Sequence, residues 1–271
     1  MKRIAVTMGL MLLFGAGAAR ADLVMYFSFD QATMIDDDGA QKTITADIGS
    51  DGTIEANAGD LANKSVSGKF GNAVTLDGND YVNLSANVAT IGSLTTGSIA
   101  FWFKTTGGFG TFLSGSDASD ASSEIRVFPW DTSGRLAYES RNDATTLFRQ
   151  ITPAVPPGVK YNDGEWHHIT AISKASGNEL YVNGTLTGVT SVAGNSFLSA
   201  VEGLDTLLVG AARGTGEKWF YTGAIDELGI WDHALSQSEI DALQTGAIPE
   251  PTTGVFLFLG ALLLRFVRWR R

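Results

Sequence analysis

The chain has 271 residues, 44% of them hydrophobic, and a formal net charge of −10 at pH 7. This acidic balance argues against nucleic acid or anionic lipid as a partner, because both carry negative charge. The absence of cysteine excludes disulfides and thiol catalysis, and with only three histidines, two of them adjacent, a three-histidine zinc site is disfavoured.

The first predicted element in chain order is a secretory signal. Two basic residues precede an apolar stretch over residues 4–14, and the small residues Ala19 and Ala21 fit the signal peptidase rule. We therefore expect a signal helix, residues 1–21, that signal peptidase removes on export. The alternative interpretation of the same apolar run is a buried N-terminal helix.

Residues 22–246 are predicted to form one all-β domain, within the size that a single core can fill. Between residues 22 and 248 there are 12 basic and 28 acidic residues, a charge that favours solubility and divalent cations. Glycines separate short β-branched or aromatic runs, which is typical of short strands joined by turns. We expect strands at 23–29, 73–76, 81–84, 98–105, 124–128, 136–140, 166–173, 206–209 and 223–231.

Three local motifs complete the domain. Asn183-Gly184 favours a tight type I′ hairpin, because both residue types tolerate positive φ angles. The prolines and glycines of residues 153–164 predict a surface loop. Ser236 and Glu239 have capping-box spacing, so we expect one short helix, about two turns long, that ends before Gly246.

Adjacent residues Trp166, His167 and His168 lie on one predicted strand. We expect Trp166 to fill the core. The two histidines should point to opposite faces of the strand and cannot act together on one substrate. A structural role is therefore expected for His167.

Residues 247–271 combine three parts in a fixed order. A Pro249, Glu250 and Pro251 triplet precedes an apolar run over residues 254–264, which is followed by four arginines: Arg265, Arg268, Arg270 and Arg271. The apolar run is shorter than the roughly 20 residues of a stable membrane-spanning helix. Because basic residues favour the cytoplasmic side, the domain before the tail is expected beyond the inner membrane.

This tail resembles the bacterial PEP-CTERM sorting signal. The resemblance implies a hydrophobic helix in transient or permanent association with the inner membrane, and recognition by an exosortase-type enzyme. Delivery to the cell surface, outer envelope or extracellular matrix would follow. An ordinary short tail anchor is the alternative. Similar tails occur on some ice-binding proteins, but the domain has no regular Thr-x-Thr array that would suggest ice binding.

Four segments, taken in order, resemble the bacterial laminin-G-like, or concanavalin A-like, jelly-roll family. They are residues 23–30, 68–82, 165–184 and 223–236, which contain LVMYFSFD, GKFGNA, EWHHI and GAIDEL respectively. The resemblance implies a two-sheet antiparallel jelly-roll sandwich, in agreement with the all-β pattern.

The resemblance also implies one structural Ca²⁺ ion. The matching positions are Asp30 and Asp226, with Asp51 or backbone carbonyls from residues 47–52 as further ligands. In the alternative interpretation, Asp30 and Asp226 cap turns by accepting backbone N–H bonds.

No catalytic residue is predicted. Jelly-roll glucanases carry Glu-x-Asp-x-x-Glu on one strand. When Asp226 is aligned with the aspartate of this motif, Ala224 stands in place of the first glutamate, and the last glutamate is missing. We therefore expect binding of a glycan or matrix component, with Trp219 and Tyr221 after the glycine-rich residues 210–216 as the contact edge. Two alternatives stay open: a glycoside hydrolase of the same fold and a non-catalytic structural surface protein.

Overall fold

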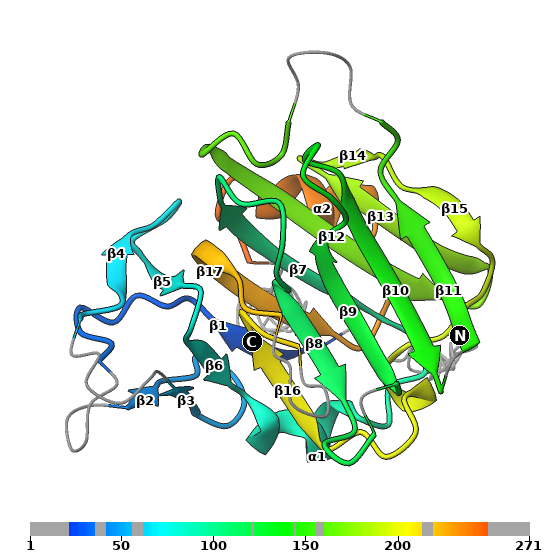
Figure 1. Ribbon diagram of the computed structural model, residues 1–271, viewed down its shortest axis with the longest axis horizontal. Helices are drawn as coiled ribbons and strands as arrows, with labels where there is room; N and C mark the ends of the chain where they lie inside the picture. Colours follow the sequence, from blue (N-terminus) through cyan, green and yellow to red (C-terminus); the bar gives the residue numbers. More distant parts are fainter. Residues whose placement is uncertain are drawn as a thin grey trace, which may run out of the picture.

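The computed structural model describes residues 22–35, 42–55, 62–120, 122–143, 145–154, 160–212 and 219–248. These residues form two antiparallel sheets packed face to face, which confirms the predicted β sandwich (Figure 1). The predicted signal helix and the sorting tail from Pro249 onward lie outside the described residues. Within the described residues, no helix is long and apolar enough to cross a membrane.

The first sheet has eight strands. Its order is β14 (Thr185–Leu186), β13 (Gly177–Val182), β12 (Trp166–Lys174), β7 (Gly97–Lys104), β17 (Thr222–Trp231), β5 (Asn72–Asp77) and β4 (Ser65–Ser67). The eighth strand, β1 (Leu23–Phe27), pairs with the second half of β17, whose first half pairs with β5. A bulge between Asp226 and Gly229 marks this change of neighbour.

The second sheet has nine strands. Its order is β15 (Val189–Val192), β11 (Thr145–Ile151), β10 (Leu136–Asn142), β9 (Glu124–Pro129), β8 (Leu113–Ser116), β16 (Thr206–Val209), β6 (Tyr81–Asn83), β3 (Gly52–Glu55) and β2 (Thr43–Ile44). Helix α1 (Val88–Ile91) and two 3₁₀ turns, Ser85–Asn87 and Leu198–Ala200, lie in the connections.

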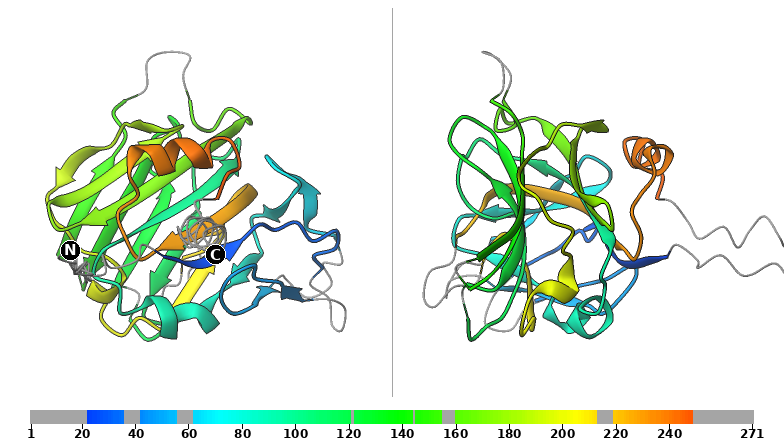
Figure 2. Two further views of the ribbon diagram at one scale, coloured as in Figure 1. Left: turned by 180° about the vertical axis from the view of Figure 1, so that it is seen from behind. Right: turned by 90° about the vertical axis from the view of Figure 1, so that its right-hand side faces the viewer.

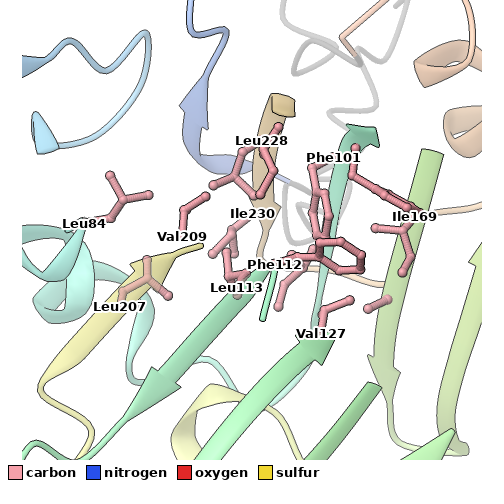
Figure 3. Close-up of a cluster of buried hydrophobic side chains, with 14 of the residues drawn as sticks. Leu84, Phe101, Phe112, Leu113, Val127, Ile169, Leu207, Val209, Leu228 and Ile230 are labelled. Carbon is pink, nitrogen blue, oxygen red and sulfur yellow. The ribbon is translucent and has the colours of Figure 1, made fainter. Parts of the chain in front are cut away.

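The main core lies between the two sheets. Side chains alternate along a strand, so Ile99, Phe101 and Phe103 of β7 all point inward. Figure 3 shows Phe101 from the first sheet together with Leu113 and Val127 from the second. This contiguous apolar cluster needs no disulfide, as expected for a domain of this size.

A second hydrophobic cluster lies on the outer face of the eight-stranded sheet. Ala100 of β7 and Trp231 of β17 pack there against Ile240 and Leu243 of helix α2 (Gln237–Leu243). In the right-hand view of Figure 2, α2 lies outside the sandwich, on the side opposite to β9, β10 and β11. Both faces of the central strand β7 are therefore buried.

The predicted capping box is confirmed at the start of α2. The Ser236 hydroxyl accepts the Glu239 N–H, and the Glu239 carboxylate accepts the Ser236 N–H at 2.7 Å. The predicted hairpin is also confirmed, because Asn183 and Gly184 both have positive φ, +50° and +76°.

Substitution Ser236→Ala is expected to lower the free energy of unfolding by about 1 kcal/mol, because one N-terminal N–H of α2 loses its acceptor. Urea unfolding measures the change. Ser238→Ala, two positions into the same turn, is the matched control and should leave the unfolding midpoint nearly unchanged. Equal midpoints for the two variants would contradict the capping role.

Candidate functional site

The aromatic rim, defined by Phe109, Trp130 and Trp219, lies on loops at one end of the sandwich. The loops follow β7, follow β9 and precede β17. Phe109 is 65% exposed and Trp219 is 53% exposed, a large apolar area for a water-facing surface.

Close backbone packing holds these loops together. A Cβ added at Gly110 would lie 2.5 Å from the Phe220 carbonyl oxygen, so the loop that carries Phe109 runs directly against the segment that carries Trp219. A Cβ added at Gly108 would lie 2.5 Å from the Thr132 Cα, which places the same loop against the turn after Trp130. The rim therefore brings together aromatic residues that are far apart in sequence.

Trp219 and Tyr221, the two predicted contact residues, have different positions. Trp219 is exposed, as predicted, whereas Tyr221 is fully buried. The Tyr221 hydroxyl donates to the Lys104 carbonyl at 2.9 Å, its ring meets Phe112 edge-on, and burial raises its pKa above the ordinary value. The prediction that Tyr221 contacts a ligand is therefore corrected: it is a core residue that supports the rim from below.

An arginine–glutamate network covers the outer face of β9, β10 and β11. It consists of Glu124, Arg126, Glu139, Arg141 and Arg149. Cross-strand pairing places Glu139 between Arg126 and Arg149, and Arg141 opposite Glu124. Glu139 is fully buried and accepts from Arg126 Nη2 at 2.6 Å and Arg149 Nε at 2.5 Å. Arg141 Nη2 lies 2.8 Å from Glu124 Oε1.

This network continues into the aromatic rim. The Arg149 guanidinium lies 5.1 Å from the centre of the Trp130 ring, and the Arg126 guanidinium lies 4.1 Å above Phe128. Cation–π contacts of this kind hold both the arginine and the ring in place. The surface is thus apolar at the rim and rich in fixed hydrogen-bond donors beside it.

The carboxylates of the network are charge partners of the arginines. Burial raises the pKa of Glu124, and the nearby charges of Arg126 and Arg141 oppose that shift. Three guanidinium groups face two carboxylates, so the network carries one excess positive charge on an acidic domain. Sequence analysis missed this face, although Glu-x-Arg spacing on two predicted strands was its signal.

Of the three acids predicted to bind calcium, Asp30 and Asp226 meet at one turn, whereas Asp51 bonds elsewhere. Asp226 Oδ2 accepts the N–H groups of Lys69 and Phe70, at 2.8 and 3.1 Å. Asp30 Oδ1 accepts the Asn72 N–H, and Asp51 Oδ1 accepts the Ala46 N–H. These are hydrogen bonds of the turn-capping kind, and two of the acids hold the same turn, residues 68–72.

The groups around Asp226 suit a cation only in part. Asp226 Oδ1 is buried and has no hydrogen-bond partner, a feature that a cation would satisfy. However, no group of three aspartate, glutamate or histidine side chains within the described ranges could hold a metal ion. A calcium site formed by Asp30 and Asp226 with backbone carbonyls stays a prediction.

The Asp226 carboxyl makes stability depend on pH. Burial, with the neighbouring charge of Glu227, raises its pKa from 3.8 to about 7, against the opposing effect of the two N–H donors. The folded protein thus binds more protons than the unfolded chain between these values, so stability falls as pH rises through this window. We expect Asp226→Asn to reduce that fall.

Urea unfolding at about pH 5 and about pH 8, in the presence of EDTA, measures the free energy of unfolding of the wild type and of Asp226→Asn. Superimposable pH profiles of the wild type and the variant would contradict a raised Asp226 pKa. Adding millimolar calcium at the higher pH tests the cation separately, because an ion that binds only the folded state must raise the midpoint.

The strand that carries Trp166, His167 and His168 agrees only in part with its prediction. His168 is buried against Trp102, and burial lowers its pKa to about 3, whereas His167 is bonded to Asp163 on the other face. The histidines thus point apart, as predicted. Trp166 is half-buried on the outer face of the sheet and lines a groove of about 530 Å³, so the prediction that it fills the core is corrected.

Comparison with known proteins agrees with this architecture. Residues 76–241 match the model of the concanavalin A-like lectin/glucanases superfamily. A rat protein with sushi, von Willebrand factor type A, EGF and pentraxin domains is 26% identical over 183 residues, which cover 64% of this chain. The chain spans only 5% of that relative's length.

Solved structures with this fold include two carbohydrate-binding domains. One is the CBM40 domain of Ruminococcus gnavus IT-sialidase bound to α2,3-sialyllactose, with 20% identity, a TM-score of 0.55 and coverage of 64% of this chain and 96% of that one. The other is domain 4 of the AbnA arabinanase from Geobacillus stearothermophilus in complex with arabinotriose, with 22% identity, a TM-score of 0.55 and coverage of 83% and 99%. At these identities the likeness establishes the fold.

Proposed function

The chain belongs to the concanavalin A-like lectin/glucanases superfamily, and from this membership we propose that it is an exported, non-catalytic glycan-binding protein. The aromatic rim is its contact surface. The observation that carries the proposal is that two exposed rings, Phe109 and Trp219, are carried by loops whose backbones pack against each other. Aromatic faces pack against the C–H faces of sugar rings. An aromatic side chain that faces water without a ligand gives up the stabilisation that burial would provide.

The arginine–glutamate network supports the same proposal. Arg126 and Arg149 are held by buried carboxylates and by ring contacts, so their remaining donors are presented in fixed directions. Fixed donors beside an apolar platform suit a polyhydroxylated ligand, because little conformational entropy is lost on binding. Two structural neighbours were solved in complex with saccharides, sialyllactose and arabinotriose, which is consistent with this ligand class.

Location follows from the two ends of the sequence. We propose that signal peptidase and an exosortase-type enzyme process the chain, and that the domain then acts at the cell surface, outer envelope or extracellular matrix. Its partners there are glycans or other matrix components. The hydrophobic tail associates with the inner membrane on the way.

Hydrolysis is the second candidate function, favoured by one observation. Glu124 and Glu139 are two buried carboxylates on one face, both contacted by Arg126. A glycosidase needs such a pair, with one carboxyl free to donate its proton. Here arginines bind both groups, so binding without cleavage is the better-supported function.

Co-sedimentation with insoluble polysaccharides, followed by a reducing-sugar assay of the supernatant, separates the candidates. We expect retention and no sugar release. Release that is lost in Glu124→Gln or Glu139→Gln would establish a hydrolase. A protein that neither sediments nor releases sugar would be a structural surface protein.

A further inference from the structure

A second recess lies at the sheet edges, away from the strand-end loops that form the aromatic rim. On this side β14 is the last strand of the eight-stranded sheet and β15 is the last strand of the nine-stranded sheet. Figure 1 shows β13, β14 and β15 together on the same side of the sandwich. Between them is a cleft of about 520 Å³, here called the lateral cleft, a volume typical of small-ligand sites.

Two nearly buried amide side chains line the lateral cleft. Gln150 is 3% exposed and Asn178 is 6% exposed. Gln150 Nε2 donates to the Thr190 hydroxyl at 2.9 Å, and Asn178 Nδ2 donates to the Ser173 hydroxyl at 2.6 Å. Interior positions at the side of a sandwich are ordinarily apolar, so two amides here are a departure that packing does not require.

Asn178 has an unused acceptor. Its Nδ2 is shared between the Ser173 hydroxyl and the Ser196 carbonyl, whereas its Oδ1 has no hydrogen-bond partner among the described residues. A buried acceptor without a donor is unfavourable, so the hydrogen bonding of this cleft-lining amide is incomplete. Because this oxygen is itself buried, a hydroxyl or N–H group in the cleft reaches it only when the Asn178 side chain moves.

Glycines shape the cleft wall. A Cβ at Gly194 would lie 2.3 Å from the Leu147 carbonyl oxygen, and a Cβ at Gly188 would lie 2.7 Å from the Leu180 Cβ. Both positions therefore need glycine for close backbone approach. Gly177, with a φ of +128°, completes a wall of backbone rather than of mobile side chains.

The remaining lining groups define the chemistry of a ligand. Lys174 and Glu179 form an ion pair, so they give the cleft no net charge, and Leu186 adds an apolar surface that is 52% exposed. Fixed amides, a neutral ion pair and one apolar side match the hydroxyls and the C–H face of a neutral sugar. An anionic ligand would find no excess positive charge among these residues.

We propose that the lateral cleft is a second saccharide site, selective for neutral sugars, on the same domain as the aromatic rim. The proposal for the lateral cleft rests on the proposed function only for its ligand class, saccharides. None of the residues that line the cleft belongs to the aromatic rim. Two sites on one chain can engage one polymer at two points or join two polymers. Linking two weak sites raises the overall affinity by about 10²–10⁴-fold when both can be occupied together.

The test follows the side-chain amide signals of Gln150 and Asn178 in ¹⁵N-labelled protein during titration with arabinotriose and, separately, lactose. We expect saturable shifts at both amides with at least one of these sugars, in the wild type and equally in Trp219→Ala. Ala193 is exposed and lines the cleft, so Ala193→Trp should fill it and abolish the shifts without changing the melting temperature. Ser191→Trp, on β15 two residues before Ala193 and outside the lining, is the matched control.

Each other outcome counts against the proposal. The absence of shifts at both amides with both neutral sugars would overturn the site. Undiminished shifts in Ala193→Trp would also overturn it. Shifts with 3′-sialyllactose alone would overturn the neutral class, and shifts with an extended Thr-Val hexapeptide alone would replace the sugar by a peptide strand. Because Trp219→Ala reports the rim separately, failure of one site is distinguishable from failure of the other.

Discussion

Replacing Lys64 by methionine is expected to lower the free energy of unfolding by about 3–5 kcal/mol, because the change leaves a buried carboxylate unpaired. Lys64 Nζ lies 2.6 Å from Asp80 Oδ2 and 2.9 Å from Asp77 Oδ2. Both Lys64 and Asp80 are almost completely buried. Burial raises the pKa of Asp80, and the charge and hydrogen bond of Lys64 oppose that shift. Each charge of the pair therefore offsets the cost of burying the other.

Urea unfolding measures this loss, with two controls. Asp77→Asn alters the exposed partner and should cost only about 0–1 kcal/mol, as for a surface ion pair. Adding Asp80→Asn to Lys64→Met removes the stranded charge and should recover part of the loss. A Lys64→Met variant as stable as Asp77→Asn would contradict the account.

Trp219→Ala is expected to weaken glycan binding by about 30-fold, equivalent to about 2 kcal/mol, the effect of removing a central aromatic contact. The side chain is more than half exposed, so the melting temperature should hardly change. The polysaccharide that retains the wild type most strongly in co-sedimentation is the ligand for this measurement.

Ile48→Ala is the matched control, because Ile48 is an exposed apolar residue, 40% accessible, outside the rim. It should bind as the wild type does. Equal weakening by Ile48→Ala and Trp219→Ala would show that apolar surface in general, and not the rim, carries the interaction. An unaltered affinity in Trp219→Ala would remove the rim from the site.

The fold was predictable from sequence because its signals are local. Alternating apolar residues mark β7, turn residues mark the Asn183-Gly184 hairpin, and the Ser236 cap marks α2. Short or polar strands gave no such signal. The three-residue β4 and the largely exposed β15 bury too little apolar surface to show an alternation of apolar and polar residues. Only their pairing with neighbouring strands defines them.

The site was predictable in part. Trp219 follows a glycine-rich stretch and is exposed, as the sequence suggests, but Tyr221 is buried because its hydroxyl reaches the end of β7, a contact made only by the folded sheet. The arginine–glutamate network depends on the register between β9, β10 and β11, which residue patterns do not specify. Calcium was inferred from a family pattern and stays a prediction, whereas the bonds of Asp226 to the turn at residues 68–72 are contacts that only the folded chain makes.

A glycan array probed with the wild type and with a Phe109→Ala/Trp219→Ala double variant tests the central claim most directly. We expect the wild type to bind at least one class of glycan, and the double variant to lose that signal while retaining the wild-type melting temperature. A wild type that binds nothing on the array, or a double variant that binds as strongly as the wild type, would contradict glycan recognition by the aromatic rim.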